Sequence, residues 1–465
     1  MSLESLKYYP PSESQGFFFT LLEYTPYKEL LQLPFTFVLQ EPVDFDILKK
    51  AMNIEIERND CLRLCFEKKE KSYVQCFLPQ RPLDDIEIID FRGKTQKQQD
   101  AYFSKDAKKP IRYLKDEIYR IKFFHTHDGR SGLYFNAIHM IIDGYGLNVM
   151  LADLFKVYRA LKEGTDLPPP LVPFEEVLKK ELEYKTNEKQ QKKDMEFFAQ
   201  FLTEHGEAVY AGVHGPELLE KQRKKTKNPA KRSLHFNYFL FNKTGIVNEK
   251  MDTALYQKLK AFCAERAISV QNLIQLVYRT HLSKVNNGET DISFDVFCDR
   301  RPTLAQRNTS GCLTQSVPFR TVISNESTVP QALDEIATVL QRLYHHTQHP
   351  HLRSWGIAKK LYGTGSGNLD LYTAMQFSFV DLPPMREGFP KIETKWVSPG
   401  RFLVALYPQV LPDLMEEGLV FNYEYRRQFV TQEHVQAMHR ASMRMLEKII
   451  EKPDITIAEL QKVAY

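Results

Sequence analysis

The chain has 465 residues, and 63 basic against 59 acidic side chains give it a formal net charge of +4 at pH 7. This balance gives no sign of a nucleic-acid or membrane-surface partner, and we expect neither. Apolar residues make up 43% and charged residues 26%, which is ordinary for a globular protein and excludes a disordered or fibrous chain. The length allows two large domains or about three small ones.

No apolar run approaches the length of a membrane-spanning helix, and the first residues lack the apolar core of a signal peptide. The cysteines show no CxxC spacing, so we expect reduced thiols and no zinc site. They stand at positions 61, 65, 76, 263, 298 and 312. These features predict a cytoplasmic protein.

Strand and helix patterns alternate irregularly along the first part of the chain. Alternating apolar residues predict strands, and helical spacing of apolar residues predicts helices. The predicted strands are 34–40, 72–78, 119–127 and 132–138, and the predicted helices are 46–58 and 145–161. A proline-rich stretch at 167–173 then breaks the pattern and is the best linker candidate.

The part after this linker again mixes helices with strands, so each half is expected to be an α/β sandwich. Helices are predicted at 174–202, at 253–285 as a pair with Ser269 capping the second, at 329–346 and at 431–451. Strands are predicted at 291–298, at 373–380 and in a hairpin of 402–410 with 418–425.

One motif carries chemistry. His139 stands at the end of an apolar strand, Asp143 follows four positions later, and Gly144 comes next, before a helix. A neutral imidazole with a reference pKa of about 6.5 can accept a proton from an amine or a hydroxyl. Asp143 can hold the turn or an arginine, and Gly144 can adopt a φ that other residues resist. The alternatives are a satisfied core histidine and a helix N-cap.

The chain resembles the condensation domain of nonribosomal peptide synthetases, a family related to chloramphenicol acetyltransferase, over nearly its whole length. The family's HHxxxDG motif reads IHMIIDG at 138–144, with isoleucine for the first histidine. The other motifs occur in the family's order as RNDCLRLCF at 58–66, FCDRRP at 297–302, GCLTQSVPFR at 311–320 and HTQHP at 346–350.

The resemblance implies an α/β fold of two chloramphenicol-acetyltransferase-like sandwich lobes, arranged as a V-shaped pseudo-dimer with a tunnel between them. The expected lobes are residues 1–173, which hold the HxxxDG motif, and 174–465, which send a crossover segment to the first lobe. Ile138, Gln315 and Ser316 are expected to line the tunnel. Gln315 replaces the usual asparagine and Ile138 the first histidine.

The resemblance also implies the reaction: transfer of an acyl or aminoacyl group from a carrier-bound thioester to an acceptor amine. His139 would act on the amine, and the Gly144 amide would help to stabilise the oxyanion. Asp143 would pair with an arginine, for which Arg301 is the first candidate and Arg63 and Arg320 follow.

Peptidyl or acyl carrier proteins are the implied partners, with an adenylation domain as a possible neighbour, and we expect a monomer. No cofactor is implied, because the substrates arrive on phosphopantetheine arms. Two other functions stay open: an O-acyltransferase acting on a soluble alcohol, and a non-catalytic recruitment module for carrier proteins. An intact HxxxDG motif favours an enzyme. The donor, the acceptor and their stereochemistry cannot be read from the sequence.

Three weaker signals receive plain structural interpretations. Lys221–Arg232 is strongly basic but has no interleaved aromatics, so we expect a solvated loop rather than a phosphate site. Four histidines at 345, 346, 349 and 351 are interpreted as a solvated helix end, and no metal is predicted. Cys298 and Cys312 are expected to be inert buried thiols that could border the tunnel.

Overall fold

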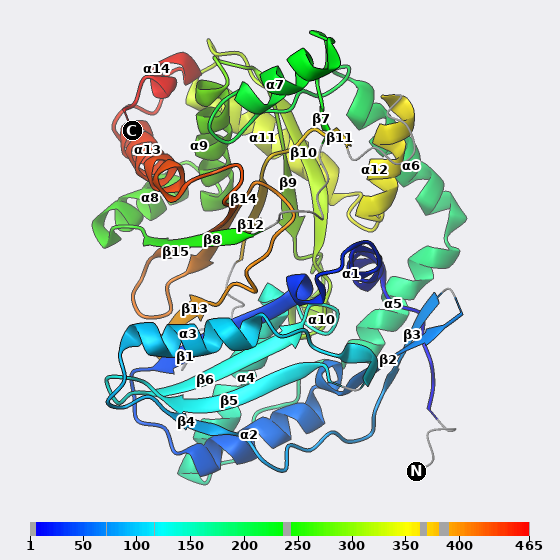
Figure 1. The fold of residues 1–465 in the computed structure, drawn as a ribbon, viewed down its shortest axis with the longest axis vertical. Coiled ribbons are helices and arrows are strands. Elements are labelled where there is room, and N and C mark those ends of the chain that lie inside the picture. The colour runs from blue at the N-terminus through cyan, green and yellow to red at the C-terminus, as the bar shows by residue number, and fades with distance from the viewer. Residues whose placement is uncertain are drawn as a thin grey trace.

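The computed structural model describes residues 6–70, 72–115, 117–235, 243–362, 370–380 and 390–464. It is an α/β structure with two large sheets, one in the lower and one in the upper half of Figure 1. We call the part built on the sheet with β1 the first lobe, and the part built on the sheet with β9 the second lobe. The two lobes correspond to the predicted pair of α/β sandwiches.

The first lobe contains a five-stranded sheet in the order β13-β1-β6-β5-β4. Its strands are β1 (Gln32–Leu39), β4 (Ile88–Asp90), β5 (Tyr119–His125), β6 (Ser131–Ile138) and β13 (Ile392–Trp396). Every residue of β1 and β6 is buried, because helices cover both faces of the sheet. The continuous apolar runs of these strands are the sequence signature of that burial.

The first lobe also includes four helices and a hairpin from the first part of the chain. They are α1 (Glu13–Tyr24), α2 (Phe45–Arg58), α3 (Gln96–Ala107), α4 (Gly144–Glu163) and the hairpin of β2 (Leu64–Lys69) with β3 (Ser72–Phe77). Helices α2 and α4 pack against each other on one face, and α3 covers the other through Phe103. Helix α1 lies between the two lobes (Figure 1).

The second lobe contains a six-stranded sheet in the order β10-β9-β12-β14-β15-β8. Its strands are β8 (Thr244–Lys250), β9 (Asp291–Cys298), β10 (Gln315–Val322), β12 (Gln376–Phe379), β14 (Leu406–Pro412) and β15 (Leu419–Arg426). Strand β12 is parallel to both of its neighbours, and the other pairs are antiparallel. The short strands β7 (Leu234–His235) and β11 (Asp370–Leu371) form a separate two-stranded antiparallel sheet.

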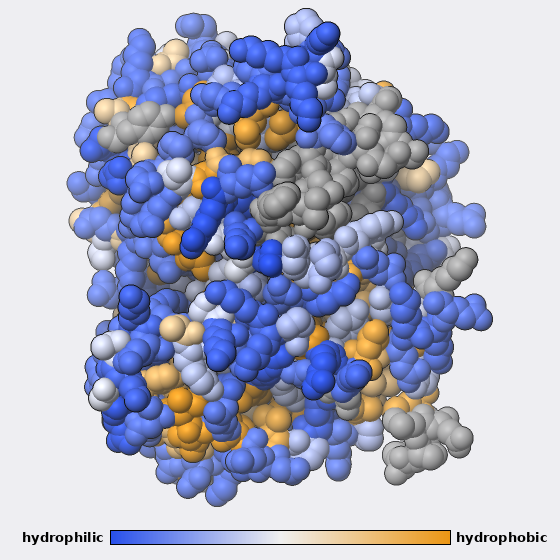
Figure 2. Space-filling view, viewed as in Figure 1, coloured by the Kyte–Doolittle hydropathy of each residue, from blue (hydrophilic) through white to orange (hydrophobic). Residues whose placement is uncertain are grey.

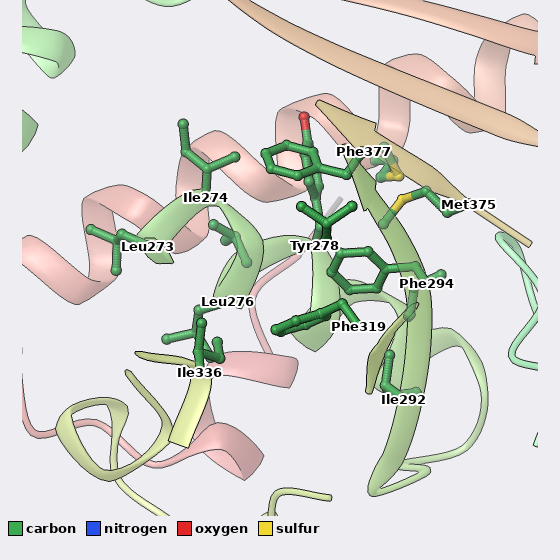
Figure 3. Close-up of a cluster of buried hydrophobic side chains, with 14 of the residues drawn as sticks. Leu273, Ile274, Leu276, Tyr278, Ile292, Phe294, Phe319, Ile336, Met375 and Phe377 are labelled. Carbon is green, nitrogen blue, oxygen red and sulfur yellow. The ribbon is translucent and has the colours of Figure 1, made fainter. Parts of the chain in front are cut away.

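The core of the second lobe lies between this sheet and its helices. The helices are α8 (Thr253–Glu265), α9 (Val270–Val285), α11 (Val329–Tyr344), α13 (Gln432–Glu451) and α14 (Ile457–Gln461). Figure 3 shows Tyr278 of α9 reaching towards Phe377, with the two ring centres 5.6 Å apart. Phe294 and Phe319 of adjacent strands lie below them, 4.9 Å apart. Burial of these apolar side chains stabilises the lobe.

A strand from the second half of the chain completes the first sheet. Strand β13 pairs antiparallel with β1, with Phe35 opposite Trp396 and Leu39 opposite Ile392. Both Ile392 and Trp396 belong to the first core. The second half of the chain therefore crosses to the first lobe, as the resemblance implies.

The packing places the change of lobe later than residue 173. Helix α5 (Phe174–Thr186) buries Phe174 and Leu178 in the first core, whereas α6 (Glu188–Thr203) buries Phe198 in the second. The single predicted helix at 174–202 is two helices, because the Asn187 side chain accepts the Gln190 amide and starts a new one.

The remaining helices also differ in part from the sequence-based expectations. They are α7 (Glu217–Thr226), α10 (Leu304–Arg307) and α12 (His351–Leu361). Half of the basic stretch predicted as a loop is α7, which ends where Lys227 takes a φ of 52°. Ser269 precedes α9 as predicted, but its side chain makes no capping hydrogen bond.

The face of the molecule drawn in Figure 2 is largely hydrophilic, with small hydrophobic areas scattered over both lobes. Scattered apolar residues of this kind are normal on protein surfaces. Across the described ranges, no helix is long and apolar enough to cross a membrane.

Candidate functional site

The HxxxDG turn lies where the two lobes meet. Strand β6 ends at Ile138, and the amide of His139 donates to the carbonyl of Leu31, at 2.8 Å. The chain then turns and enters α4 at Gly144. The buried strand and the buried helix fix the histidine between them.

His139 opens on a cavity of about 150 Å³ whose walls come from both lobes. The HxxxDG turn contributes His139, Asp143 and Gly144. The second lobe contributes residues of the neighbouring strands β12, β14 and β15 and the end of β9. A cavity enclosed in this way can exclude water and hold a substrate against the histidine.

The His139 ring is enclosed by neutral groups. Phe18 of α1 stacks on it with ring centres 4.0 Å apart, and the Cys312 Sγ lies 3.9 Å from its Nδ1. Burial lowers the pKa of His139 to about 4, although the Asp143 charge and the histidine's own backbone oppose the shift. The imidazole is therefore neutral at pH 7 and able to accept a proton or a hydrogen bond.

Asp143 both caps α4 and pairs with an arginine. Its Oδ1 accepts the Gly146 amide at 2.7 Å, and its Oδ2 accepts the amides of Leu313 and Thr314 at 2.7 and 2.9 Å. The Arg301 guanidinium donates to both oxygens, at 2.9 and 3.0 Å. The capping and ion-pair interpretations of Asp143 are therefore both correct.

Arg301 is held from all sides. Besides Asp143, it donates to the carbonyls of Asp299 and Gly311, at 2.9 and 2.7 Å, and stacks over the Tyr145 ring at 4.7 Å. Its side chain has no exposed surface, and Asp143 has 1%. Arg301, the first candidate for the ion pair with Asp143, is therefore its partner in the structure.

The two reserve arginines bind elsewhere. Arg63, named in advance as a possible member of the ion pair, donates to the carbonyls of Ile56 and Leu78 instead. Arg320 forms a bidentate pair with Asp291, at 2.7 and 2.8 Å. Both predictions for these arginines as partners of Asp143 are wrong, because each has a nearer acceptor within its own lobe.

Arg300, beside Arg301, makes a second contact between distant segments. It donates to Glu181 of α5 at 2.5 Å and to Ser14 of α1 at 2.9 Å. Its φ of 54° lies in the left-handed region, which is uncommon for a residue other than glycine. The two adjacent arginines bind different partners: Arg300 binds Glu181 and Ser14, and Arg301 binds Asp143.

The glycine with a steric requirement is Gly146 rather than Gly144. A Cβ on Gly146 would lie 2.0 Å from the carbonyl oxygen of Ser310, whereas one on Gly144 would meet only Val380, at 3.6 Å. Gly144 can adopt a φ that other residues resist, but it is not among the described glycines with a positive φ. Gly146 allows the start of α4 to approach the backbone of the segment between β9 and β10.

The three residues predicted to line the tunnel lie outside the cavity wall. Ile138 is packed in the first core, and Ser316 is buried in β10. The Gln315 amide donates to the carbonyls of Thr347 and His349. The neighbours of two of them, His139 and Thr314, line the cavity instead. Successive side chains along extended backbone point to opposite sides, which accounts for the error.

Several cavity residues had no motif to mark them. Phe18 lies in α1, a helix that was not predicted because its run of three phenylalanines at 17–19 shows no helical spacing. Tyr407 and Glu424 lie in predicted strands, but nothing in the strand pattern shows which end faces the other lobe. Cys298, in contrast, borders the cavity as expected, and burial raises its pKa to about 12.

In the histidine group at 345–351, only His345, which directly follows α11, is exposed as predicted, and the other three are not a solvated helix end. His349 and His351 are 0% and 2% exposed, and His346 lies 2.7 Å from Asp194 while stacking on Phe197. Burial lowers the pKa of His349 to about 4 and that of His351 to about 3. Within the described ranges, no group of three or more metal-ligating side chains is present.

Removing the Asp143 carboxylate is expected to destabilise the protein strongly. Asp143→Ala strands the buried Arg301 charge, at a cost of roughly 3–5 kcal/mol. Asp44→Ala is the control, because Asp44 caps α2 through two backbone amides without an arginine, and loss of such a cap costs about 1 kcal/mol. Chemical denaturation measures both. Equal costs would reduce Asp143 to a helix cap.

The two glycines at the start of α4 form a matched pair. Gly146→Ala should lower the denaturation midpoint, because its Cβ meets backbone that cannot move aside. Gly144→Ala should leave the midpoint unchanged or raise it, because alanine favours a helix and the nearest atom is 3.6 Å away. Thermal unfolding of the two variants compares them directly. The reverse order would show that the contact with Ser310 does not constrain the turn.

The sequence is similar to those of several known peptide synthases. Surfactin synthase subunit 1 of Bacillus subtilis (strain 168) is 21% identical over 473 residues, an alignment that covers 99% of this chain and 12% of the synthase. Gramicidin S synthase 2 of Brevibacillus brevis is 21% identical over 392 residues, which is 82% of this chain and 8% of the synthase. The chain thus spans 12% or less of these relatives.

Solved structures share the fold. The first condensation domain of the calcium-dependent antibiotic synthetase, in complex with a substrate analogue, has a TM-score of 0.79 and 15% identity over 97% of this chain and 99% of that one. A four-domain nonribosomal peptide synthetase bound to AMP and glycine has a TM-score of 0.73 and 12% identity over 98% of this chain and 34% of its own.

The family model described as Condensation domain matches residues 5–369, which is well over half of the chain. The matched segment includes the histidine turn, the Asp143–Arg301 pair and most of both lobes. The chain therefore belongs to the condensation domain family.

Proposed function

We propose that this chain is an acyltransferase that joins a carrier-bound acyl or aminoacyl thioester to an acceptor amine, forming an amide. The observation that carries the proposal is a buried, neutral His139 facing a cavity that both lobes enclose. The relatives support the proposal, because they are synthetases of peptides such as surfactin and gramicidin S.

The proposed reaction is nucleophilic substitution at the thioester carbonyl. The amine nitrogen attacks the carbonyl carbon, the C–N bond forms, and the C–S bond breaks. One amine proton finally resides on the thiol of the released carrier arm. Both substrates arrive on phosphopantetheine arms of carrier proteins, so the proposal requires no resident cofactor.

His139 would orient the amine and take its proton. A ring whose pKa is about 4 is a weak base towards a neutral amine, but it stays unprotonated at pH 7. The attacking nitrogen becomes much more acidic once it bears positive charge in the tetrahedral intermediate, and a neutral imidazole can then accept the proton. A well-placed general base of this kind accelerates a reaction by typically about 10²–10⁴-fold.

The start of α4 offers a donor for the developing oxyanion. Within the described chain, the Gly144 amide donates to no protein acceptor, as is usual for the first residue of a helix, and Gly144 borders the cavity. The positive end of the helix dipole lies at the same place. An oxyanion formed beside His139 would gain from both.

The direct test is product formation on carrier proteins. Donor carriers loaded with a panel of acyl and aminoacyl groups are mixed with aminoacyl acceptor carriers, and intact-mass spectrometry detects transfer. An amide on the acceptor carrier supports the proposal. Transfer only to a soluble alcohol would favour an O-acyltransferase. Binding of carriers without transfer from any donor would favour a recruitment module.

A carrier-bound donor is expected to outperform the same acyl group on coenzyme A by at least about tenfold in kcat/KM, some 1.4 kcal/mol. Docking of the carrier makes the encounter effectively intramolecular, which raises the local concentration of the thioester. Competition between the two donors in one reaction measures the ratio. Equal or better use of the coenzyme A thioester would contradict carrier dependence.

Replacing the histidine should slow the chemical step without unfolding the protein. His139→Ala is expected to lower the single-turnover rate by about 10²–10⁴-fold, because proton transfer and amine positioning are lost. His439→Gln is the control, since His439 is also buried with its pKa lowered to about 4 but lies in the second core beside Tyr423. A His139→Ala rate near that of the unaltered protein would refute the role.

A further inference from the structure

The two walls of the cavity differ in chemistry. The first lobe contributes mainly aromatic and aliphatic side chains, such as Phe17, Leu30 and Phe35. The second lobe adds a row of polar side chains from three adjacent strands: Gln376, Ser378, Tyr407, Gln409 and Glu424. A ligand that fits both walls has an apolar body and a polar group directed towards the second lobe.

Glu424 is the charged member of this polar row. It lies on β15 between Tyr407 of β14 and Ile246 of β8, and it is 1% exposed. Its Oε1 accepts from the hydroxyls of Ser398, at 2.5 Å, and Thr244, at 3.0 Å. These neutral donors hold the carboxylate in one place at the cavity wall.

The carboxylate of Glu424 lacks a counterion. Within the described chain, no lysine, arginine or histidine forms an ion pair with it. Burial raises its pKa to about 7, and the Ser398 and Thr244 hydroxyls and the Trp396 side chain only partly oppose the shift. A buried carboxylate without a cation is costly, so a site of this kind favours any cation that can reach it.

The other charged groups of the cavity wall do not supply that cation. The ionisable side chains among the described lining residues include His139, which is neutral, and Asp143, which Arg301 already neutralises. Asp299 adds a further acid, and the described lining includes neither lysine nor arginine. The wall therefore presents net negative charge to a ligand.

We propose that Glu424 binds a positively charged nitrogen of the substrate, so that the preferred substrate has an apolar body and a basic group besides its reacting amine or thioester. This inference rests on the proposed acyl transfer, and it assigns that reaction a class of substrate. Glu424 is thus a specificity-determining residue. The ammonium pairs with the carboxylate, which the Ser398 and Thr244 hydroxyls hold in position.

Small probes test the binding step without requiring catalysis. Hexylammonium and 1-hexanol have the same apolar chain and differ in charge, and calorimetric titration at pH 8 compares their affinities for the full chain. At this pH the Glu424 carboxylate is mainly ionised. We expect the unaltered protein to bind hexylammonium at least about tenfold more tightly than hexanol.

Two matched variants locate the preference. Glu424→Gln keeps the shape and removes the charge, so it should reduce the ratio of affinities to less than about threefold. Asp295→Asn should retain the full ratio, because Asp295 is equally buried, with its pKa also raised to about 7, but does not line the cavity. Thermal unfolding checks that both variants fold.

Each outcome decides the inference. Equal affinities for the two probes, no measurable binding of hexylammonium, or a ratio that Glu424→Gln leaves unchanged would overturn it. The comparison on the unaltered protein needs no variant and stands even if Glu424→Gln fails to fold. Amide formation on carrier proteins with no hexylammonium preference would refute the cation site and leave the proposed function intact. The preference without any amide product would refute the reaction instead.

Discussion

The geometry of the site depends on one buried ion pair, Asp143 with Arg301. A single carboxylate caps α4, accepts the amides of Leu313 and Thr314 and binds the Arg301 guanidinium, and all three partners lie in the segment between β9 and β10. The pair therefore fixes the position of the histidine turn against the opposite wall of the cavity. Because both groups are buried away from water, removing either partner would leave an unpaired charge and lower the stability of the protein. This constraint positions His139 together with the backbone hydrogen bond to Leu31 and the stacked Phe18 ring.

The parts of this arrangement that the sequence predicted are those coded by local patterns. The apolar run of β6, the HxxxDG turn and the helix after it occupy adjacent residues, so periodicity and spacing were sufficient. Arg301 could be predicted as the partner of Asp143 because it belongs to a second motif, FCDRRP at 297–302. The prediction for the later histidines was wrong because their burial is not coded locally. It depends on Phe198 and on β10, which are distant in sequence.

The remaining errors have the same physical origin. Whether Ile138 or His139 faces the cavity depends on the side of the sheet that each occupies, and a motif gives residue types without that orientation. The role of Gly146 depends on how closely Ser310 approaches it, which is a tertiary contact. Glu424 belongs to an ordinary strand pattern, and only the packing of Ser398 and Thr244 around it reveals a buried acid.

Strand β13 has a consequence for the order in which the protein is made. The first sheet lacks an edge strand, and its core lacks Ile392 and Trp396, until the ribosome has synthesised most of the chain. Until then β1 presents an unpaired edge of buried, apolar residues, the kind of surface on which nascent chains aggregate. The lobe that emerges first is therefore completed late, and its exposed edge is the segment that a chaperone would need to protect during translation.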